Sequence, residues 1–291
     1  MTDLADLLGR YVADGSVPGV VALIARGEEV EEAVLGSATL GETPMTRNAI
    51  FRLASITKPI TAAAVMILVE EDRVSLHDPV ETWLPELSKP SVVRTPASPV
   101  NDLVPATRPI TVFDLLTSRA GYGFPSDFTL SAVQRLFEVQ KDGREPQSFL
   151  PQDAWMAALS DIPMLYQPGE AWLYDTCSVL QGVLVSRVSG QSLSAFLTDR
   201  IFQPLEMDNT GFVVPARKLE RLTSYYRASP GGSLELVDGP DGQWSTPPPI
   251  FLGNGGLAGT ADDGLPSRAC CWPAAPPPTV TGCYRPTLCS S

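Results

Sequence analysis

Ser55 and Lys58 are the residues whose types and spacing are best suited to chemistry in this sequence. Proline is tolerated in the first turn of a helix, so Pro59 places the start of a helix near Ser55. A separation of three residues then places the Ser55 and Lys58 side chains on one face of that helix. A serine there lies near the positive end of the helix dipole and near free backbone N–H groups, which favour a developing oxyanion. A desolvated lysine can act as base for the hydroxyl. The same four-residue pattern also arises from an N-cap serine and a solvated lysine, so it is weak evidence by itself.

Other catalytic arrangements find little support. His77 is the only histidine, and its place in the turn Ser75-Leu-His-Asp-Pro79 favours a solvated surface residue over a member of a triad. No Gly-x-Ser-x-Gly motif occurs. One histidine without an ordered cysteine cluster excludes an ordinary zinc site, so we expect no metal. The glycines of 253–258 imitate a dinucleotide-binding motif, but no convincing strand precedes them and no acid follows Asp263, so we expect no cofactor.

Composition limits the classes of partner. The chain has 291 residues, 44% of them hydrophobic, which is far too apolar for a disordered chain. Lys and Arg number 21 against 33 Asp and Glu, for a net charge of −12, which argues against nucleic acid or an anionic membrane as a partner. The longest apolar run is far too short to span a bilayer. The acidic N-terminus has no signal pattern, so we expect a cytoplasmic protein; oligomeric state cannot be read from the sequence.

The residue pattern predicts a hairpin, a strong helix and a loop-rich helical region. The strands are expected at 20–25 and 30–38, and the strong helix at about 56–71. Six prolines between Pro85 and Pro109 predict an irregular excursion, and 121–169 is expected to be loop-rich with one or two short helices. Further helices are expected at 3–13, 112–117, 153–159, 176–189 and 193–201. This order predicts an α+β fold whose first strands find partners late in the sequence.

Five segments, in order along the chain, resemble the serine β-lactamase and penicillin-binding-protein superfamily, and best its class C-like esterase branch. The stretch from Phe51 to Glu81 carries Ser-Ile-Thr-Lys, and Gln167-Pro-Gly-Glu-Ala-Trp-Leu-Tyr-Asp-Thr is similar to the branch's Tyr-x-Asn segment. The other three are Ile110–Gly123, Ile201–Phe212 and the glycine-rich 253–263. The resemblance covers nearly all of 1–263. It implies a β-lactamase/transpeptidase-like fold, with an antiparallel sheet flanked by helices and a mostly helical region.

The resemblance implies a role for each motif residue. Ser55 is expected to be the acylated nucleophile, Lys58 its base, and Tyr174 the phenol that relays a proton to and from the leaving group and the deacylating water. Thr176 stands where the family has Asn, in a position that contacts substrate. Tyr122 and Phe124 are candidates for the walls of the acyl pocket, with packing as the competing interpretation. Arg119 and Asp175 are either supporting residues of the site or merely solvated.

The implied function is that of a serine hydrolase. It forms an acyl-enzyme on a small ester, amide or β-lactam, and needs no cofactor. A second hypothesis is a non-catalytic member of the same fold that binds a ligand or partner. The family's further Lys/His-x-Gly motif, on a strand that pairs with the N-terminal hairpin, has no counterpart before the chain ends. We therefore expect the C-terminal strands to be missing, and the polypeptide to be poorly stable and weakly active or inactive.

The last residues differ in composition from the rest. From Gly264 to Ser291 there is no acid and no lysine, and four of the five cysteines lie here. We interpret 1–263 as an incomplete hydrolase domain and 264–291 as a disordered, Pro/Cys-rich tail derived from a frameshift. The frame that joins the third base of each codon to the first two bases of the next encodes Leu-Leu-Ala across Cys270, Cys271, Trp272 and Pro273, whichever codons the gene uses. Leu-Leu-Ala is an ordinary helical sequence.

The frameshift hypothesis is testable on the coding DNA. Resequencing from codon 255 onward is expected to show a shifted frame that runs on for roughly a hundred residues and contains Lys/His-x-Gly, completing one large domain. Finding no such frame would make the tail genuine and favour the non-catalytic hypothesis.

Overall fold

The computed structural model describes residues 3–27 and 29–265, and these form two compact units. The first comprises the described residues up to Leu53, Ile201–Pro247 and those from Leu257 onward; the second comprises Ala54–Arg200 and Pro248–Gly256. Helices and antiparallel strands are both present, as the α+β prediction requires. Apart from Gly264 and Leu265, the predicted tail lies outside the described residues.

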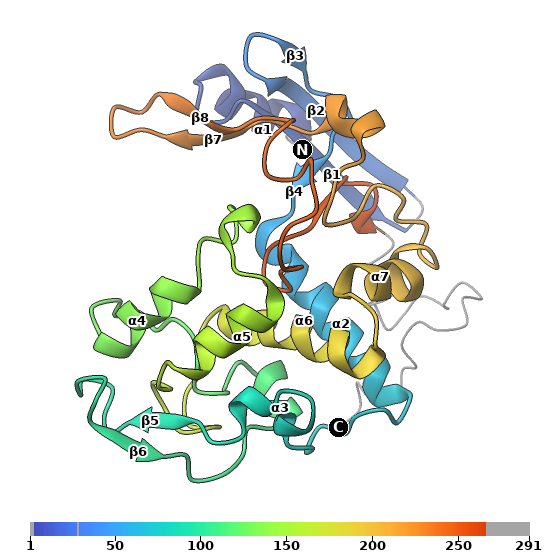
Figure 1. Cartoon of the computed structure of the whole chain (residues 1–291). Coiled ribbons are helices and arrows are strands. Elements are labelled where there is room, and N and C mark those ends of the chain that lie inside the picture. The colour runs from blue at the N-terminus through green and yellow to red at the C-terminus, as the bar shows by residue number, and fades with distance from the viewer. Residues whose placement is uncertain (1–2, 28, 266–291) are drawn as a thin grey trace. The chain divides into compact units, whose positions relative to one another are not determined.

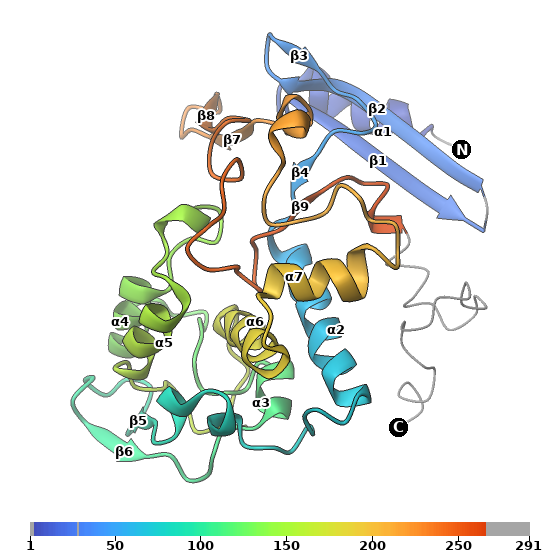
Figure 2. The same ribbon diagram turned by 45° about the vertical axis from the view of Figure 1, so that its right-hand side comes forward.

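The first unit is built on the predicted hairpin. The strands β1 (Gly19–Arg26) and β2 (Glu29–Thr39) pair antiparallel, and β2 also pairs with β3 (Thr43–Pro44). Ala33 and Ala38 of β2 are buried. The helix α1 (Leu4–Ala13) packs on β2, as Figure 2 shows. The predicted hairpin and first helix are confirmed.

Late segments of the chain complete this unit. Ile50 exchanges backbone hydrogen bonds with Arg221 and Thr223, and β4 (Phe51–Arg52) pairs with β9 (Ala258–Gly259). Late partners therefore reach β4, which was not among the predicted strands. The late partners were predicted for the hairpin, whose strand β1 is an edge strand of its sheet within the described residues. A hydrophobic cluster lies beneath these contacts and consists of Ile50, Val214, Leu222, Trp244 and Ala258.

A second hairpin in the first unit was not predicted. It joins β7 (Tyr225–Ala228) to β8 (Leu234–Asp238). Asp238 at its end forms an ion pair with Arg52, and the Arg52 guanidinium lies over the Trp244 ring, 5.2 Å from its centre. The alternation in this segment is weak, since Leu236 and Val237 are both exposed.

The second unit is organised around two helices. Helix α6 (Thr176–Ser189) is buried from Thr176 to Val185, and α2 (Thr57–Glu70) packs along it (Figure 1). Helices α3 (Val112–Leu116) and α7 (Leu193–Leu197) also pack on α6. Because its first ten residues are all buried, α6 forms the centre of this unit. These four helices were predicted; the last continues as a π-helical turn over Thr198–Phe202.

The proline-rich part of the second unit is more regular than predicted, because it contains the paired strands β5 (Ser91–Val93) and β6 (Leu103–Pro105). The loop-rich region contains α4 (Ser131–Val139) and α5 (Gln152–Ser160), within the one or two short helices expected there. Each strand is only three residues long, too short to give an alternating signal among prolines. Short 3-10 helices lie at Ala54–Ile56, Val80–Thr82, Pro85–Leu87, Pro146–Ser148 and Ala216–Arg221.

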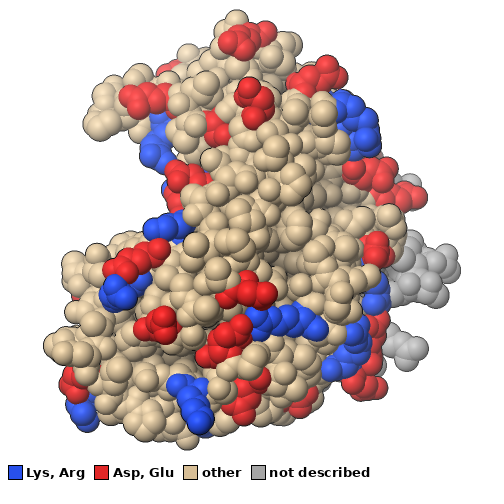
Figure 3. All heavy atoms as spheres, in the orientation of Figure 1, with Lys and Arg blue, Asp and Glu red and all other residues tan. Residues whose placement is uncertain are grey.

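Charges of both signs are interspersed on the face seen in Figure 3. Within residues 3–27 and 29–265, no helix is long and apolar enough to cross a bilayer.

Gly253 lets the glycine-rich segment lie against both central helices of the second unit. Its carbonyl accepts a hydrogen bond from Thr61 Oγ1 of α2 at 2.9 Å. A Cβ at this position would lie 2.3 Å from the Ser178 carbonyl oxygen of α6 and 2.8 Å from Thr61 Cγ2. Both neighbours belong to buried helices, so neither can move easily.

Gly253→Ala is therefore expected to destabilise the protein by about 1–3 kcal/mol, the usual result of overpacking. The measurement is the thermal unfolding midpoint. Gly255→Ala is the matched control, because its nearest contact would be an ordinary 3.8 Å. Equal midpoints for the two variants would contradict the inferred close approach.

Candidate active site

Ser55 lies in the 3-10 turn Ala54–Ile56, immediately before α2. The turn leads into the helix with the spacing expected from the sequence, and Lys58 Nζ lies 3.0 Å from Ser55 Oγ. Ile56 is the N-cap residue and provides no side-chain cap. Ala54 has φ +44°, a left-handed conformation that costs about 1–3 kcal/mol for a residue with a Cβ and that recurs at functional sites.

Tyr174 is held by backbone pairing with Phe124. The Phe124 N–H donates to the Tyr174 carbonyl at 2.9 Å, and the Tyr174 N–H donates back at 3.1 Å. Gly123, with φ +141°, permits this approach, since a Cβ there would lie 2.6 Å from the Tyr174 carbonyl oxygen. Tyr174 Oη consequently lies 2.8 Å from Ser55 Oγ and 3.3 Å from Lys58 Nζ. The structure thus brings the three predicted catalytic side chains together.

Asp175 joins this cluster through an unusual backbone turn. Its φ and ψ are +84° and −61°, and the Thr176 N–H bonds the Tyr174 carbonyl at 3.2 Å, which defines a strained γ-turn. The Asp175 carboxylate lies 2.8 Å from Lys58 Nζ. Sequence reasoning left Asp175 between a supporting and a solvated role. Its neighbour Tyr174 was the only signal, and the turn that redirects its side chain cannot be read from residue types.

The glycine-rich segment contributes Asn254. Its backbone carbonyl accepts a hydrogen bond from Lys58 Nζ at 2.8 Å, and its side-chain amide donates to Asp175 Oδ2 at 2.8 Å. Gln140, at the end of α4, donates to the same carboxylate oxygen at 2.9 Å. Both amide side chains are 2% exposed. The sequence identified the segment by its glycines but gave no signal of a role for either amide.

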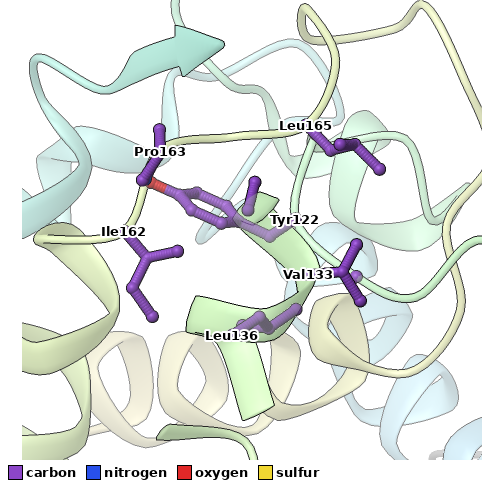
Figure 4. Close-up of a pocket in the computed structure, with 9 residues that line it drawn as sticks. Tyr122, Val133, Leu136, Ile162, Pro163 and Leu165 are labelled. Atoms are coloured by element: carbon purple, nitrogen blue, oxygen red, sulfur yellow. The ribbon is translucent and has the colours of Figure 1, made fainter. Parts of the chain in front are cut away.

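Tyr122 and Thr176 are both buried. Tyr122 is 2% exposed and lines a cavity of about 10 Å³ with Val133, Leu136 and Ile162 (Figure 4), and burial raises the pKa of its phenol. Thr176 is completely buried at the start of α6. For Tyr122 this burial favours packing, the competing interpretation. The substrate-binding roles of both residues stay predictions.

Phe124 belongs to an aromatic cluster beside Tyr174. Opposed residues of an antiparallel pair project from the same side, so the Phe124 ring lies on the Tyr174 side of the pairing. It stacks on Phe137 at 4.7 Å and meets Phe128 edge-on at 6.2 Å. Trp172 lies 6.0 Å from the Tyr174 ring and is 61% exposed. The aromatic cluster is here defined as Phe124, Phe128, Phe137 and Trp172; only Phe124 was predicted.

Other groups considered from the sequence lie apart from this arrangement. His77 and Arg119 are exposed. Cys177 is buried in α6, and burial raises the pKa of its thiol to about 12, so it is a poor nucleophile. Within the described part of the chain, no group of His, Cys, Asp and Glu side chains could hold a metal ion.

The cluster combines an exposed hydroxyl with two proton-handling groups at hydrogen-bond distance. Ser55 Oγ contacts both Lys58 Nζ and Tyr174 Oη, the geometry that activates a nucleophile and protonates a leaving group. Lys58 Nζ also lies 4.5 Å from the centre of the Tyr174 ring. The side chains of Lys58 and Asp175 are 18% and 15% exposed, so their charges are only weakly screened by solvent.

Comparison with curated proteins identifies relatives longer than this chain. Protein Rv1367c of Mycobacterium tuberculosis is 38% identical over 262 residues, which cover 88% of this chain and 63% of the relative. Esterase EstB of Burkholderia gladioli is 31% identical over 267 residues, covering 85% of this chain and 64% of the relative. The chain therefore spans just under two thirds of the length of these relatives.

Solved structures share the fold. EstCE1, a hydrolase with promiscuous acyltransferase activity, superposes with a TM-score of 0.73 at 24% identity, over 89% of this chain and 68% of that one. Simvastatin synthase LovD from Aspergillus terreus gives 0.68 at 23% identity, over 89% and 64%. The predicted β-lactamase/transpeptidase-like fold is confirmed.

The family model described as Beta-lactamase matches residues 4–265, nearly the whole of the described chain. With this match, the chain belongs to the β-lactamase family, as its motifs predicted.

Proposed function

We propose that this protein is a serine hydrolase that forms an acyl-enzyme at Ser55 on small carboxylic esters. The observation that carries the proposal is the convergence of Ser55 Oγ, Lys58 Nζ and Tyr174 Oη within 2.8–3.3 Å of one another. The names of relatives support esters over amides or β-lactams, since they include esterase EstB and a lovastatin esterase of Penicillium rubens.

In the proposed reaction, Ser55 Oγ attacks the ester carbonyl and forms a new C–O bond. The serine proton passes to the Lys58–Tyr174 pair, and Tyr174 delivers a proton to the departing alkoxide as the ester bond breaks. Water then attacks the carbonyl carbon of the acyl-enzyme, and its proton passes to the Lys58–Tyr174 pair. Ser55 Oγ takes a proton back from this pair as it leaves, so the acid is released and Ser55 is restored. Backbone N–H groups at the N-terminus of α2 lie beside Ser55 and are suited to stabilise the oxyanion.

The acyl-enzyme could also be resolved by an alcohol instead of water. The relatives include an acyltransferase, calJ of Penicillium decumbens, and EstCE1 with its promiscuous acyltransferase activity. Transfer needs the same three residues, with the acceptor alcohol in place of the water that attacks the acyl-enzyme. It is a second candidate activity for the same site.

The aromatic cluster supports a substrate with a sizeable apolar group. Phe124 is fixed by its backbone pairing with Tyr174, and Trp172 presents a largely exposed indole 6.0 Å from the ring of the same tyrosine. Exposed aromatic surface beside a nucleophile is suited to pack against an alkyl or aryl part of an ester.

Ser55→Ala is expected to abolish covalent labelling by a fluorophosphonate probe and hydrolysis of 4-nitrophenyl esters, because no other hydroxyl occupies the position of Oγ. Labelling is measured by intact mass and the modified residue by peptide mapping. Labelling that persists in Ser55→Ala would contradict the proposal, and an unlabelled wild-type protein would favour the non-catalytic hypothesis.

Trp172→Ala is expected to lower kcat/KM for 4-nitrophenyl hexanoate about tenfold, equal to about 1.4 kcal/mol of lost apolar contact. The acetate ester, which has little to pack against the indole, should change much less. Phe113→Ala is the matched control, since Phe113 is a comparably exposed aromatic of the same unit that contacts His77. An unchanged hexanoate-to-acetate ratio in Trp172→Ala would exclude the aromatic cluster as a substrate contact.

A further inference from the structure

The carboxylate of Asp175 is bound on both oxygens. Oδ1 lies 2.8 Å from Lys58 Nζ, and Oδ2 accepts from Gln140 Nε2 at 2.9 Å and from Asn254 Nδ2 at 2.8 Å. The two amides come from segments far apart in the sequence, yet both direct their NH2 groups to one oxygen. This convergence fixes the rotation of the carboxylate and points its other oxygen at Lys58.

Stability does not explain this arrangement. Asp175 adopts the strained γ-turn, and the amide oxygens of Gln140 and Asn254 have no hydrogen-bond partner within the described residues although both are buried. Unsatisfied buried acceptors and positive φ are both unfavourable, and a buried ion pair is weak evidence for a stabilising role. Such a concentration of unfavourable features beside a nucleophile indicates a functional constraint.

The contacts of Lys58 Nζ show that the fixed Asp175 carboxylate restricts the orientation of the lysine amine. A tetrahedral nitrogen has three directions besides its bond to Cε. Asp175 Oδ1 and the Asn254 carbonyl, each at 2.8 Å, occupy two of them. The remaining direction faces Ser55 Oγ at 3.0 Å and Tyr174 Oη at 3.3 Å. The nitrogen cannot rotate away from the two hydroxyls without breaking one of the two shorter contacts.

We propose that Asp175 is a positioning residue that acts through Lys58: it locks Nζ between Ser55 and Tyr174 in the orientation needed for acylation. The proposal rests on the hydrolase function proposed above. No hydrogen bond links the Asp175 carboxylate to Ser55 or Tyr174 in the described structure, and a substrate is not needed to contact it. Its effect is therefore expected in the rate of acylation and not in substrate binding.

Asp175→Asn tests this with little change of shape. An asparagine would present an NH2 group either to Lys58 or to the NH2 groups of Gln140 and Asn254, so one contact becomes repulsive. The variant is expected to lower kcat about a hundredfold, the loss typical of a misplaced catalytic group, with KM nearly unchanged. The rate of Ser55 labelling by fluorophosphonate should fall in parallel.

A double-mutant cycle separates positioning from general damage. If Asp175 acts through Lys58, Asp175→Asn has no further effect on the labelling rate in a Lys58→Ala background. An equal loss in both backgrounds, or no loss in either, would overturn the proposal. Glu86→Gln is the matched control, because Glu86 forms an ion pair with Arg187 in the same unit at similar exposure, 22% and 21%. Its labelling rate should equal that of the wild type.

A second measurement needs no catalytic activity. The rate at which acetic anhydride modifies Lys58, followed by peptide mass spectrometry, is expected to rise severalfold in Asp175→Asn and to stay unchanged in Glu86→Gln. Unchanged Lys58 reactivity would show that Asp175 does not hold the amine. Wild-type protein that is never labelled at Ser55 would reject the hydrolase proposal, whereas labelled wild type with a fully active Asp175→Asn would reject only the positioning role.

Discussion

The contacts of a single nitrogen, Lys58 Nζ, hold the candidate site together. Four oxygens lie within 3.3 Å of it, and they come from the 3-10 turn before α2, the 174–175 segment and the glycine-rich loop. The packing of α2 on α6 sets the distance between these segments, and the close approach of Gly253 to both helices brings Asn254 into reach. The core of the second unit and its chemistry therefore depend on the same few contacts.

The sequence predicted those parts of the site that follow from spacing along one element. Ser55 and Lys58 are three residues apart at a helix start, so their contact follows from helix geometry. Tyr174 could be located only through the family resemblance, since its position depends on pairing with Phe124, fifty residues earlier in the chain. Asp175 was left undecided because a γ-turn has no residue-type signature. The burial of Tyr122 and Thr176 could not be predicted, because a motif position does not state whether a side chain is buried.

The fold shows the same division. The hairpin and the long helices have strong alternation or helical periodicity, and they were predicted to within a few residues. The three-residue strands β5 and β6 and the hairpin β7–β8 depend on contacts across the chain, and their sequences are too short or too polar to show a period. The longest helices and strands can thus be predicted from their own sequence pattern, whereas the short strands form because of contacts with other parts of the chain.

The contact between Lys58 and the Asn254 carbonyl joins residues 196 positions apart. A ribosome synthesises the chain from its N-terminus, so α2, α3 and α6 emerge and can pack long before the residue that closes the site exists. Closing so large a loop costs conformational entropy, so this contact forms more slowly than the helices do. The contact also adds little to the packing of the helices that form early. The nucleophile and its lysine would meet early in biosynthesis, but the lysine would gain its final orientation only at one of the last steps of folding.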